Sequence, residues 1–505
     1  FADSAGLTHA EFRERRKLWV APTSMVKLSL LSSKPRIAKS EYISLHRKVN
    51  GASMEAGSLT LFIVASVEVG NTTTKCIITA TDLTSGKTYL VNKVVKLTRE
   101  VRKPRLGETI FGETIFGVPL TRQSIAEIVS ESIKEACNKS GINVSEIDFL
   151  VRSTGVVAHF ENPSDIGTFI QALADGSLLA GVPPGKMVPA VTKDNLPEKI
   201  RKFSLLDKVF FDGSVAGVMP PRGSTGAEIV ANEMEGELST AGIKEGAKWT
   251  DVDFRNPCIS MDFGTTLKGR ITNDDLPYAR TIGNFCGLGG AIADVITKGF
   301  LKNKEVSAID LKLCEYSIKD EAFEFAEEIH RHIRIGKVPA NCKRYGKIPV
   351  NARAAEDAGI LLVGCDVGDN GSNFNELEKI GAEIRDQNLL FATIDVVMAK
   401  IFRRILEVIQ SEGFFMENMA IGITGRAGIT GKKPWLFLEE LKDLELYKKP
   451  EKNIVFVDDG LARGAAVMAR CMNALGNPKN PIGGLRNGKC VLNERIKLQS
   501  GYFTS

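Results

Sequence analysis

Two short turns in this sequence resemble each other, and they constrain the fold more than any other feature. The first ends an apolar, β-branched run that is predicted to be a strand, Leu61–Val69, and it begins at Gly70. The second ends another predicted strand, Ile259–Phe263, and begins at Gly264. In both copies an acidic residue precedes the glycine by two positions, and threonines follow it. One such turn is common, but two copies that open similar runs of elements indicate a duplicated α/β domain.

Further elements follow the first turn at the spacing of a small sheet covered by a helix. Strands are predicted over Cys76–Ala80 and Tyr89–Leu97, so three antiparallel strands are expected here. An amphipathic helix over Ser124–Asn138 and a strand over Ile147–Arg152 come next. Between the strand over Tyr89–Leu97 and this helix lies a tandem copy of Gly-Glu-Thr-Ile-Phe within residues 107–116, which we expect to form a loop or a hairpin.

The duplication predicts two domains and two additional segments. We expect a leader over residues 1–58, a first domain over 59–255 and a second domain over 256–505. The stretch 301–358 is rich in charge and includes an amphipathic helical pattern near Ala322–His330, so we interpret it as a peripheral insertion in the second domain. Its two histidines, His330 and His332, lie on different sides of a helix and are expected to be solvated.

Composition argues against several other classes of protein. The chain has 505 residues, of which 43% are hydrophobic and 25% charged, so it can bury more than one ordinary core. Its net charge is only +5 and it has no long basic run, which argues against a nucleic-acid partner. Nine cysteines without a Cys-x-x-Cys pair indicate neither a disulfide framework nor a structural zinc site, and favour a reducing cytoplasmic location. No apolar run reaches the roughly 18 residues that span a bilayer.

The two turns have the composition of a phosphate-binding site. Glycine lets backbone N–H groups approach a polyphosphate without a Cβ in the way. Hydroxyl, amide and ammonium groups next to both glycines can donate further hydrogen bonds. The predicted phosphate-binding residues are Gly70, Asn71, Thr72, Thr73, Thr74, Lys75, Gly264, Thr265 and Thr266.

The acidic residues before the two glycines are candidate metal ligands. Glu68 and Asp262 are suited to bind a hydrated Mg²⁺, because magnesium keeps most of its waters and takes few carboxylates. Asp262 could also orient an attacking water. Both residues are therefore catalytic candidates.

Two later segments end strands in glycine-containing turns. In Met419–Gly431 a predicted strand ends at a Thr-Gly turn, where a flat adenine could lie against backbone. In Ile454–Ala469 a second strand is followed by a helix of small residues that could pack closely. Each could equally be an ordinary strand-to-helix turn. The candidate adenosine-binding residues are Thr424, Gly425, Arg426, Gly460, Arg463 and Gly464.

Four of these segments, taken in order, resemble the motifs of the actin/Hsp70/sugar-kinase superfamily. Its two phosphate motifs, adenosine motif and second connecting motif are similar to Glu68–Lys75, Asp262–Thr266, Thr424–Gly425 and Gly460–Ala466. The resemblance covers about residues 60–475. It implies an α/β fold in which two ribonuclease-H-like (actin-like ATPase) domains flank a nucleotide cleft, and it implies Mg-ATP as the cofactor.

Within that superfamily the chain is most similar to ATP-dependent activators of 2-hydroxyacyl-CoA dehydratases and to benzoyl-CoA-reductase-type ATPases. The similarity is carried by Val151–Gly155, Asn232–Ala247 and Asn284–Gly290. These activators hold a [4Fe–4S] cluster between two subunits, so the resemblance implies a homodimer with Cys286 and Cys365 as candidate cluster ligands. The alternative is that both cysteines are small buried hydrophobes. The sequence departs from the pattern in having a glutamate, not an aspartate, in the first phosphate motif, and in lacking the activators' Gly-Gln-Asp in the second.

Over its whole length the chain resembles the methanogenesis marker protein 14 family of methanogenic archaea. This resemblance is carried by Val67–Lys75, Asp194–Pro197 and Asn284–Gly290. The resemblances together imply a protein that hydrolyses ATP in order to activate or remodel a client protein of methanogenic metabolism. Two alternatives stay open: a small-molecule kinase on the same scaffold, and a non-catalytic nucleotide-dependent scaffold, which a glutamate in the first motif would suit.

Overall fold

In the computed structural model, the first predicted strand opens a four-stranded sheet. It is β2 (Leu61–Val69), which pairs antiparallel with β3 (Thr73–Asp82), and β3 pairs antiparallel with β4 (Thr88–Leu97). The fourth strand, β7 (Phe149–Thr154), lies on the other side of β2 and runs parallel to it. The sheet order is therefore β4-β3-β2-β7. β2 has the predicted bounds, whereas β3 begins earlier than expected, at Thr73.

The structure describes residues 34–45, 61–83, 85–154, 163–187, 233–273, 281–357, 359–472, 485–486 and 489–490. Contacts gather the described residues from Pro35 onward into one compact unit, so the predicted domain boundary after residue 255 stays a prediction. Most of the predicted leader lies outside the described residues, as do Gly155, Asp194–Pro197 and Asn232 from the segments that carried the resemblances.

The second predicted strand lies inside an eight-stranded sheet. Its strands, in spatial order, are β1 (Arg36–Ala38), β16 (Ile454–Val457), β15 (Ala420–Thr424), β8 (Cys258–Phe263), β9 (Leu267–Thr272), β10 (Thr281–Gly287), β14 (Leu361–Val367) and β11 (Ile333–Lys337). β8, β9 and β10 are antiparallel neighbours, and β15 runs parallel to β8. The run β10-β9-β8-β15 therefore repeats the order and directions of β4-β3-β2-β7.

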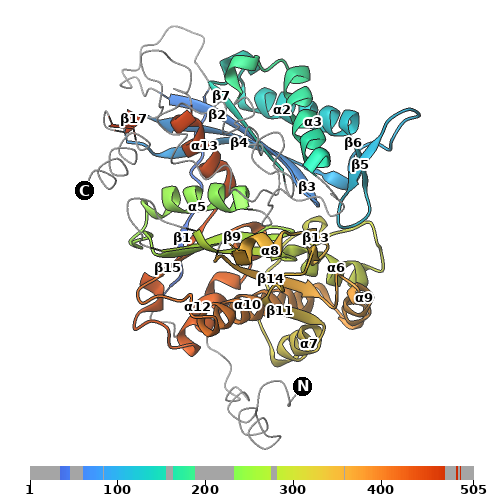
Figure 1. Cartoon of the computed structure of the whole chain (residues 1–505), viewed down its shortest axis with the longest axis vertical. Helices are drawn as coiled ribbons and strands as arrows, with labels where there is room; N and C mark the ends of the chain where they lie inside the picture. The colour runs from blue at the N-terminus through green and yellow to red at the C-terminus, as the bar shows by residue number, and fades with distance from the viewer. Residues whose placement is uncertain are drawn as a thin grey trace, which may run out of the picture. The chain divides into compact units, whose positions relative to one another are not determined.

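Helices cover both faces of the four-stranded sheet. α2 (Arg122–Ser140) and α3 (Pro163–Ala180) pack together on one face, and α13 (Gly460–Met472) covers the other (Figure 1). α2 begins where the Thr121 hydroxyl accepts the backbone N–H of Ser124, and it ends at Gly141 in the left-handed conformation (φ 67°). α13 follows the last strand of the larger sheet in sequence, yet its small residues pack on the smaller sheet.

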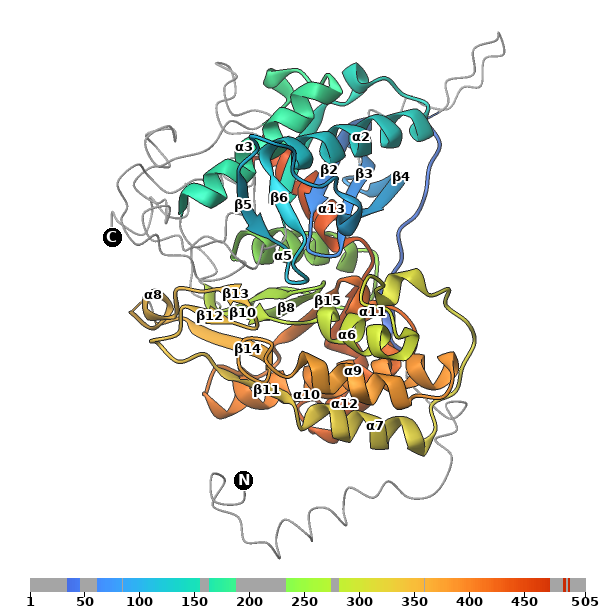
Figure 2. The ribbon, with the colours of Figure 1, turned by 90° about the vertical axis from the view of Figure 1, so that its right-hand side faces the viewer.

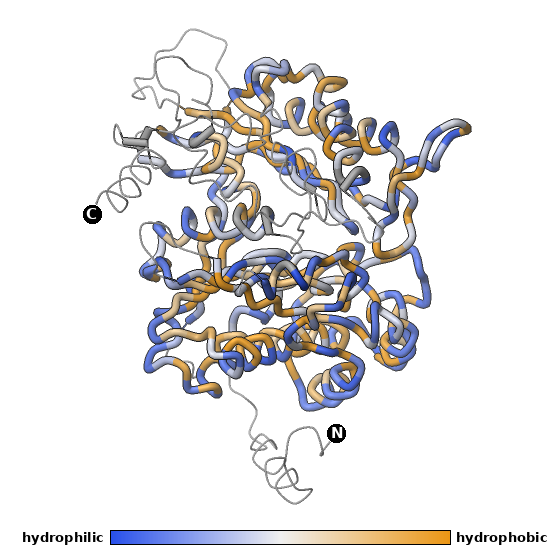
Figure 3. The backbone as a smooth tube through the Cα atoms, in the orientation of Figure 1, coloured by the Kyte–Doolittle hydropathy of each residue, from blue (hydrophilic) through white to orange (hydrophobic). Residues whose placement is uncertain are grey.

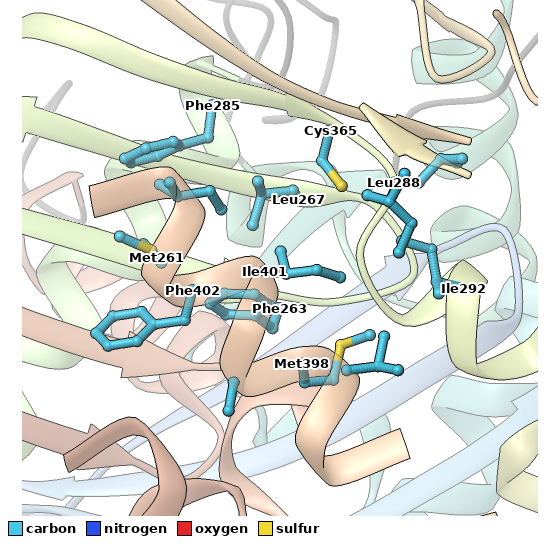
Figure 4. Packing of buried hydrophobic residues seen from close by; sticks show 14 of the residues in the cluster. Met261, Phe263, Leu267, Phe285, Leu288, Ile292, Cys365, Met398, Ile401 and Phe402 are labelled. Atoms are coloured by element: carbon cyan, nitrogen blue, oxygen red, sulfur yellow. The ribbon is translucent and has the colours of Figure 1, made fainter. Parts of the chain in front are cut away.

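The larger sheet is covered in the same way. The helices on one side are α6 (Gly290–Leu301), α7 (Asp320–His330), α9 (Phe374–Glu383), α10 (Gln387–Ser411) and α12 (Lys433–Asp443), and α5 (Glu233–Ala247) packs on the other (Figure 2). Figure 4 shows Phe263 of β8 beside Ile401 and Phe402 of α10 in the core. Hydrophobic stretches follow the strands of the smaller sheet and α10 (Figure 3). Within the described part of the chain, no helix has the length and apolarity needed to cross a bilayer.

Glycines let α5 and α13 pack with their backbones in contact. A Cβ on Gly464 would lie 1.9 Å from the carbonyl oxygen of Leu238, and a Cβ on Gly242 would lie 1.7 Å from that of Gly460. Neither position can hold a larger residue unless the helices move apart. The close packing expected of the small-residue helix is therefore present, and it joins the two sheets through one helix pair.

Part of the expected leader belongs to the larger sheet. β1 pairs in parallel with β16, with Arg36 opposite Val455 and Ala38 opposite Val457. The adjoining carbonyl of Lys39 accepts a hydrogen bond from Arg463 at 3.0 Å. This strand has no strong signal in the sequence, because three residues are too few for a visible alternation.

The charged stretch 301–358 is not purely peripheral. Its predicted helix is α7, but β11 follows it directly and forms the edge of the larger sheet, antiparallel to β14. His330, expected to be solvated, is half-buried: its Nε2 lies 3.0 Å from the carbonyl oxygen of Val397, and Arg404 lies 3.2 Å from its Nδ1. The remaining short elements are β12 (Arg344–Tyr345), β13 (Ile348–Pro349), α8 (Ala352–Asp357), α11 (Arg426–Ile429), β17 (Leu485–Arg486) and β18 (Lys489–Cys490).

The tandem repeat forms a hairpin, as expected, from β5 (Ile110–Glu113) and β6 (Pro119–Thr121). Its tip reaches the core of the larger sheet, where Ile115 is only 1% exposed. The Lys298 ammonium of α6 lies 3.5 Å from the ring centroid of Phe116. The hairpin therefore connects the part of the chain around the smaller sheet to the part around the larger one.

Candidate functional site

Both predicted turns line one pocket of about 460 Å³, a volume within the usual range of ligand sites. The predicted residues on its wall are Glu68, Gly70, Asn71, Thr72, Thr73, Lys75, Asp262, Gly264, Thr265, Thr266, Thr424, Gly425, Arg426 and Gly460. They come from the carboxyl ends of β2, β8, β15 and β16 and from the first residues of β3. The structure thus brings together segments almost 400 residues apart in sequence, between Glu68 and Gly460.

A chain of hydrogen bonds ties the two turns together. The Thr265 hydroxyl donates to the Thr72 hydroxyl at 2.9 Å, and Thr72 donates to a carboxylate oxygen of Asp294 at 3.1 Å. Asp294 lies on α6 and also accepts the backbone N–H of Ala308 at 2.8 Å. Burial raises the pKa of Asp294. Sequence reasoning missed this residue, because a single acid inside an apolar helix has no distinguishing pattern.

Backbone bonds hold each turn in place. The Gly264 carbonyl accepts the N–H of Gly290 at 2.7 Å, and the Thr265 carbonyl accepts the N–H of Ala291 at 3.0 Å, so the start of α6 fixes the second turn. In the first turn the Gly70 N–H donates to Thr73 at 2.9 Å. The Asn71 side chain accepts the N–H of Ile115, in the hairpin tip, at 2.8 Å. The first turn is therefore attached to the element that reaches the larger sheet.

Each turn presents a carboxylate opposite a lysine on the next strand. Glu68 is the cross-strand partner of Lys75, and Asp262 is that of Lys268. The ammonium of Lys75 lies 3.7 Å from Glu68, while that of Lys268 lies 3.6 Å from Glu68 and 3.8 Å from Asp262. Lys268 also contacts Glu235 of α5. Carboxylates from β2, β8 and α5 therefore converge on one buried ammonium group.

The two candidate metal ligands differ in their surroundings. Burial alone would raise the pKa of Glu68, but the ammonium groups of Lys75 and Lys268 hold it below its ordinary value. Burial raises the pKa of Asp262, and the nearby Glu68 charge adds to that effect. The Oδ2 atom of Asp262 accepts no hydrogen bond from the described residues, although it is buried. The charges of three carboxylates outweigh burial and raise the pKa of Lys268.

Lys268 and Glu235 were missed as site residues, although the sequence held a signal for the lysine. Both turns place a lysine six or seven residues after the acid, at Glu68–Lys75 and at Asp262–Lys268. Glu235 stands in a glutamate-containing helix, where sequence alone does not indicate which acid faces inward.

The Thr-Gly turn after β15 also meets the carboxylate cluster. Gly425 has φ 83°, and a Cβ there would lie 2.2 Å from the Oδ1 atom of Asp262, so glycine is required. The Thr424 hydroxyl donates to Val457 at 2.8 Å and accepts the N–H of Gly460 at 3.1 Å. Thr424 therefore holds the start of α13 beside the turn. Arg426 lines the pocket, and burial lowers its pKa.

An apolar wall closes one side of the pocket. It includes Ile309, Leu311, Leu313, Phe391, Ile394 and Ile429. Asp395 of α10, which also lines the pocket, contacts the Tyr316 hydroxyl and accepts hydrogen bonds from Lys433 Nζ and the Lys432 N–H, both at 2.5 Å. Sequence analysis missed this wall, because residues 308–316 fall in the stretch interpreted as a peripheral insertion.

Three predicted residues do not line the pocket. Thr74 faces the opposite side of β3 because side chains alternate along a strand, and its hydroxyl lies 3.2 Å from that of Thr98. Arg463 is buried, where it donates to Glu245 at 2.7 Å and joins α13 to α5. Gly464 packs against Leu238 of α5. All three contribute to the framework around the pocket.

The two candidate cluster ligands lie in the core, away from the pocket lining. Cys286 and Cys365 stand on the paired strands β10 and β14 and are both 0% exposed. Burial raises the pKa of Cys365 to about 12 and raises that of Cys286 well above its ordinary value. Among the described residues, no group of three or more His, Cys, Asp or Glu side chains is placed to hold a metal ion. This environment is that of neutral, packed thiols.

Comparison with known proteins shows similarity to other archaeal sequences. Residues 61–499 match a family model described as "Uncharacterized protein conserved in archaea (DUF2114)". An uncharacterized protein of Methanocaldococcus jannaschii is 54% identical over 478 residues, which cover 93% of this chain and 96% of that protein. One from Methanothermobacter thermautotrophicus is 50% identical over 489 residues, which cover 93% of this chain and 91% of that protein.

Solved structures are similar only at low identity. One is described as "Reductive activator for corrinoid,iron-sulfur protein"; it aligns with 12% identity and a TM-score of 0.33 over 87% of this chain and 66% of its own. The present chain thus spans slightly less than two thirds of that structure. The Aquifex aeolicus PPX-GPPA enzyme aligns with 10% identity and a TM-score of 0.28, over 69% of this chain and 93% of its own.

Proposed function

The chain belongs to this family of conserved archaeal proteins, and on that premise we propose that it is an ATP-binding, ATP-hydrolysing activator of a partner protein. The observation that carries the proposal is the meeting of two equivalent turns on one pocket with Glu68 and Asp262, one turn from the smaller sheet and one from the matching run β10-β9-β8-β15 of the larger sheet. In this proposal each sheet is the centre of a ribonuclease-H-like domain, and the triphosphate lies between the two turns.

The residues of the first turn would hold one end of the phosphate chain. Gly70 puts no side chain into the pocket, and Lys75 supplies a positive charge at the pocket wall. From the second turn, the Thr265 and Thr266 backbone and hydroxyl groups complete the set of donors. The hydrogen bond between Thr265 and Thr72 makes the two turns a single surface for a ligand that spans both.

The carboxylates fit a magnesium ion that arrives with the nucleotide. Asp262 Oδ2 is a buried acceptor that takes no hydrogen bond from the described residues, and Glu68 is held ionised by two ammonium groups. A hydrated Mg²⁺ would neutralise phosphate charge and polarise the terminal phosphoryl group. Glu68 and Asp262 would bind its waters, and Asp262 would orient the water that attacks.

The apolar wall would take the base of the nucleotide. A flat, weakly polar ring gains most from contact with apolar side chains, and Leu311, Phe391 and Ile394 supply them. Arg426 and Gly425 also line the pocket, and Gly425 lies against Asp262 and Phe263 at the end of β8. The lining therefore offers apolar side chains for a base and charged groups for phosphates.

A client enzyme of methanogenic metabolism is the partner that we propose, from the resemblances described first and from the organisms of the two relatives. Closure of the two halves on Mg-ATP would alter the surface that the client meets, as in other hinge-closing proteins. A homodimer is part of the same proposal. A [4Fe–4S] cluster is not, because both cysteines are packed in the core.

Calorimetry with Mg-ATP on the wild type and on Asp262→Ala tests the proposal. We expect the wild type to bind ATP, and Asp262→Ala to bind it about 10- to 100-fold more weakly, since a charge-assisted contact contributes about 1.5–3 kcal/mol. Asp369→Ala is the matched control, because its side chain is 80% exposed and lies outside the pocket. Absence of any adenine-nucleotide uptake by the wild type would refute the proposal.

Phosphate release separates the three functional readings. An activator should hydrolyse ATP faster when a client from native extract is added, and Asp262→Ala should lose that activity. A small-molecule kinase would instead transfer the phosphoryl group to an added metabolite. A non-catalytic scaffold would bind ATP while wild type and Asp262→Ala release phosphate equally slowly.

A further inference from the structure

We propose that Lys268 is a built-in cation of this site, a positioning residue that holds three carboxylates together and limits the pocket to one divalent ion. The limit to one divalent ion rests on the proposed function, because that ion is the one that comes with ATP. The role of Lys268 in holding the three carboxylates together concerns the protein alone and can be tested without nucleotide.

The geometry places the ammonium group where three elements meet. Lys268 Nζ contacts a carboxylate oxygen of Glu235 on α5, and it lies 3.6 Å from Glu68 on β2 and 3.8 Å from Asp262 on β8. The Lys268 side chain is 4% exposed, so bulk water screens its charge from these carboxylates only weakly. Buried carboxylates without a nearby cation are strongly unfavourable, so the lysine fixes their positions.

Charge balance explains why one divalent ion fits and a second does not. The three carboxylates together with Lys75 and Lys268 carry a formal charge of −1. One Mg²⁺ leaves a small positive charge, which suits a triphosphate. A second divalent ion among the same carboxylates would stand next to the Lys268 ammonium, and like charges at such distances repel strongly in a buried site.

One further observation agrees with this role. Asp262 Oδ2, which lies 3.8 Å from Lys268, takes no hydrogen bond from the described residues and belongs to a residue of the pocket wall. It is the acceptor left for an ion that enters from the pocket.

The substitution Lys268→Met removes the charge and keeps most of the side-chain volume. The cluster would then carry a formal charge of −2, which one divalent ion neutralises. We expect the nucleotide-free variant to bind one Mn²⁺ per chain at least 10-fold more tightly than the nucleotide-free wild type, as measured by electron paramagnetic resonance of free Mn²⁺. The double variant Lys268→Met/Glu235→Gln removes one carboxylate as well and should lose most of this gain.

Lys433→Met is the matched control. Lys433 is another buried lysine of the pocket, but it bonds a single carboxylate, Asp395, so its loss should create no Mn²⁺ site. If Lys268→Met unfolds in chelator, Mn²⁺ should raise its melting temperature more than that of the wild type. A folded Lys268→Met with unchanged Mn²⁺ affinity, or an unfolded one that Mn²⁺ does not stabilise, overturns the inference.

The outcomes also separate this inference from the proposed function. If the wild type binds no ATP but Lys268→Met gains a Mn²⁺ site, the proposed function is refuted and the inference about Lys268 stands. If the wild type binds ATP but Lys268→Met gains no Mn²⁺ site, the proposed function stands and the inference about Lys268 is refuted.

Discussion

The contact between α5 and α13 makes a sharp prediction for Gly464→Ala. The new methyl group would lie 1.9 Å from the carbonyl oxygen of Leu238, 2.7 Å from its carbonyl carbon and 3.2 Å from the nitrogen of Gly242. Ordinary contacts of a Cβ are 3.4–4 Å, so the helices must separate by about 1.5 Å. All three atoms belong to backbone, which cannot rotate away as a flexible side chain can.

The expected cost follows from two opposing effects. Overpacking of this kind typically costs about 1–3 kcal/mol. Replacing glycine by alanine inside a helix raises the free energy of unfolding by about 1 kcal/mol. Since the clash is with rigid backbone, we place the overpacking cost at the upper end and expect Gly464→Ala to lower the free energy of unfolding by about 2 kcal/mol.

Urea unfolding of three proteins measures this effect. Gly336→Ala is the control, because a Cβ there meets nothing within 4 Å, and we expect its stability to match that of the wild type or rise slightly. Because α13 begins at Gly460, on the pocket wall, Gly464→Ala should also weaken ATP binding. Equal stability of Gly464→Ala and wild type, within about 0.5 kcal/mol, would refute the packing argument.

Two further predictions concern pH and the hairpin. Burial lowers the pKa of His330 to about 3, so the folded protein keeps the ring neutral while the unfolded chain protonates it near its ordinary pKa of 6.5. As the pH drops from 6.5 towards 3, the free energy of unfolding should therefore fall by up to about 1.4 kcal/mol per pH unit because of this histidine. Urea unfolding at several pH values should show a smaller fall for His330→Gln than for the wild type. A variant with the unchanged wild-type slope would contradict this. Phe116→Ala should lower the free energy of unfolding by about 1–3 kcal/mol, and it should weaken ATP binding because the adjacent Ile115 bonds Asn71 in the first turn. The control Leu106→Ala, at a fully exposed position, should change neither stability nor ATP binding. Equal stability of both variants would exclude a role for the hairpin.

Local patterns predicted the elements better than they predicted side-chain directions. The β-branched run of β2 gave its bounds, because a buried strand has a strong and continuous signal. The same pattern predicts that Thr74 belongs to the turn. In the structure, pairing with β4 extends β3 back to Thr73, so Thr74 lies within the strand, and the alternation of side chains directs it away from the pocket. Pairing between strands depends on the whole sheet, and a short window of sequence does not contain it.

The candidate site shows the same limit. Glu68, Asp262 and both glycines were found because the motif occurs twice, and the structure places them in one pocket. Asp294, Glu235 and the apolar wall were missed, since each becomes part of the site only through distant packing. Their roles in nucleotide binding stay predictions until ATP binding is measured.

The pairing of β1 with β16 has a consequence for any attempt to divide this protein. In chain order, Arg36–Ala38 is the edge strand of the larger sheet, and the strands of the smaller sheet come next. The other strands of the larger sheet follow, and α13 then packs on the smaller sheet. A cut after residue 255 would leave one fragment without its edge strand and the other without a covering helix. During synthesis, β1 cannot pair with β16 until Val455 has left the ribosome, so this edge of the sheet closes only after more than 400 further residues, about Arg36 to Val455, have been made.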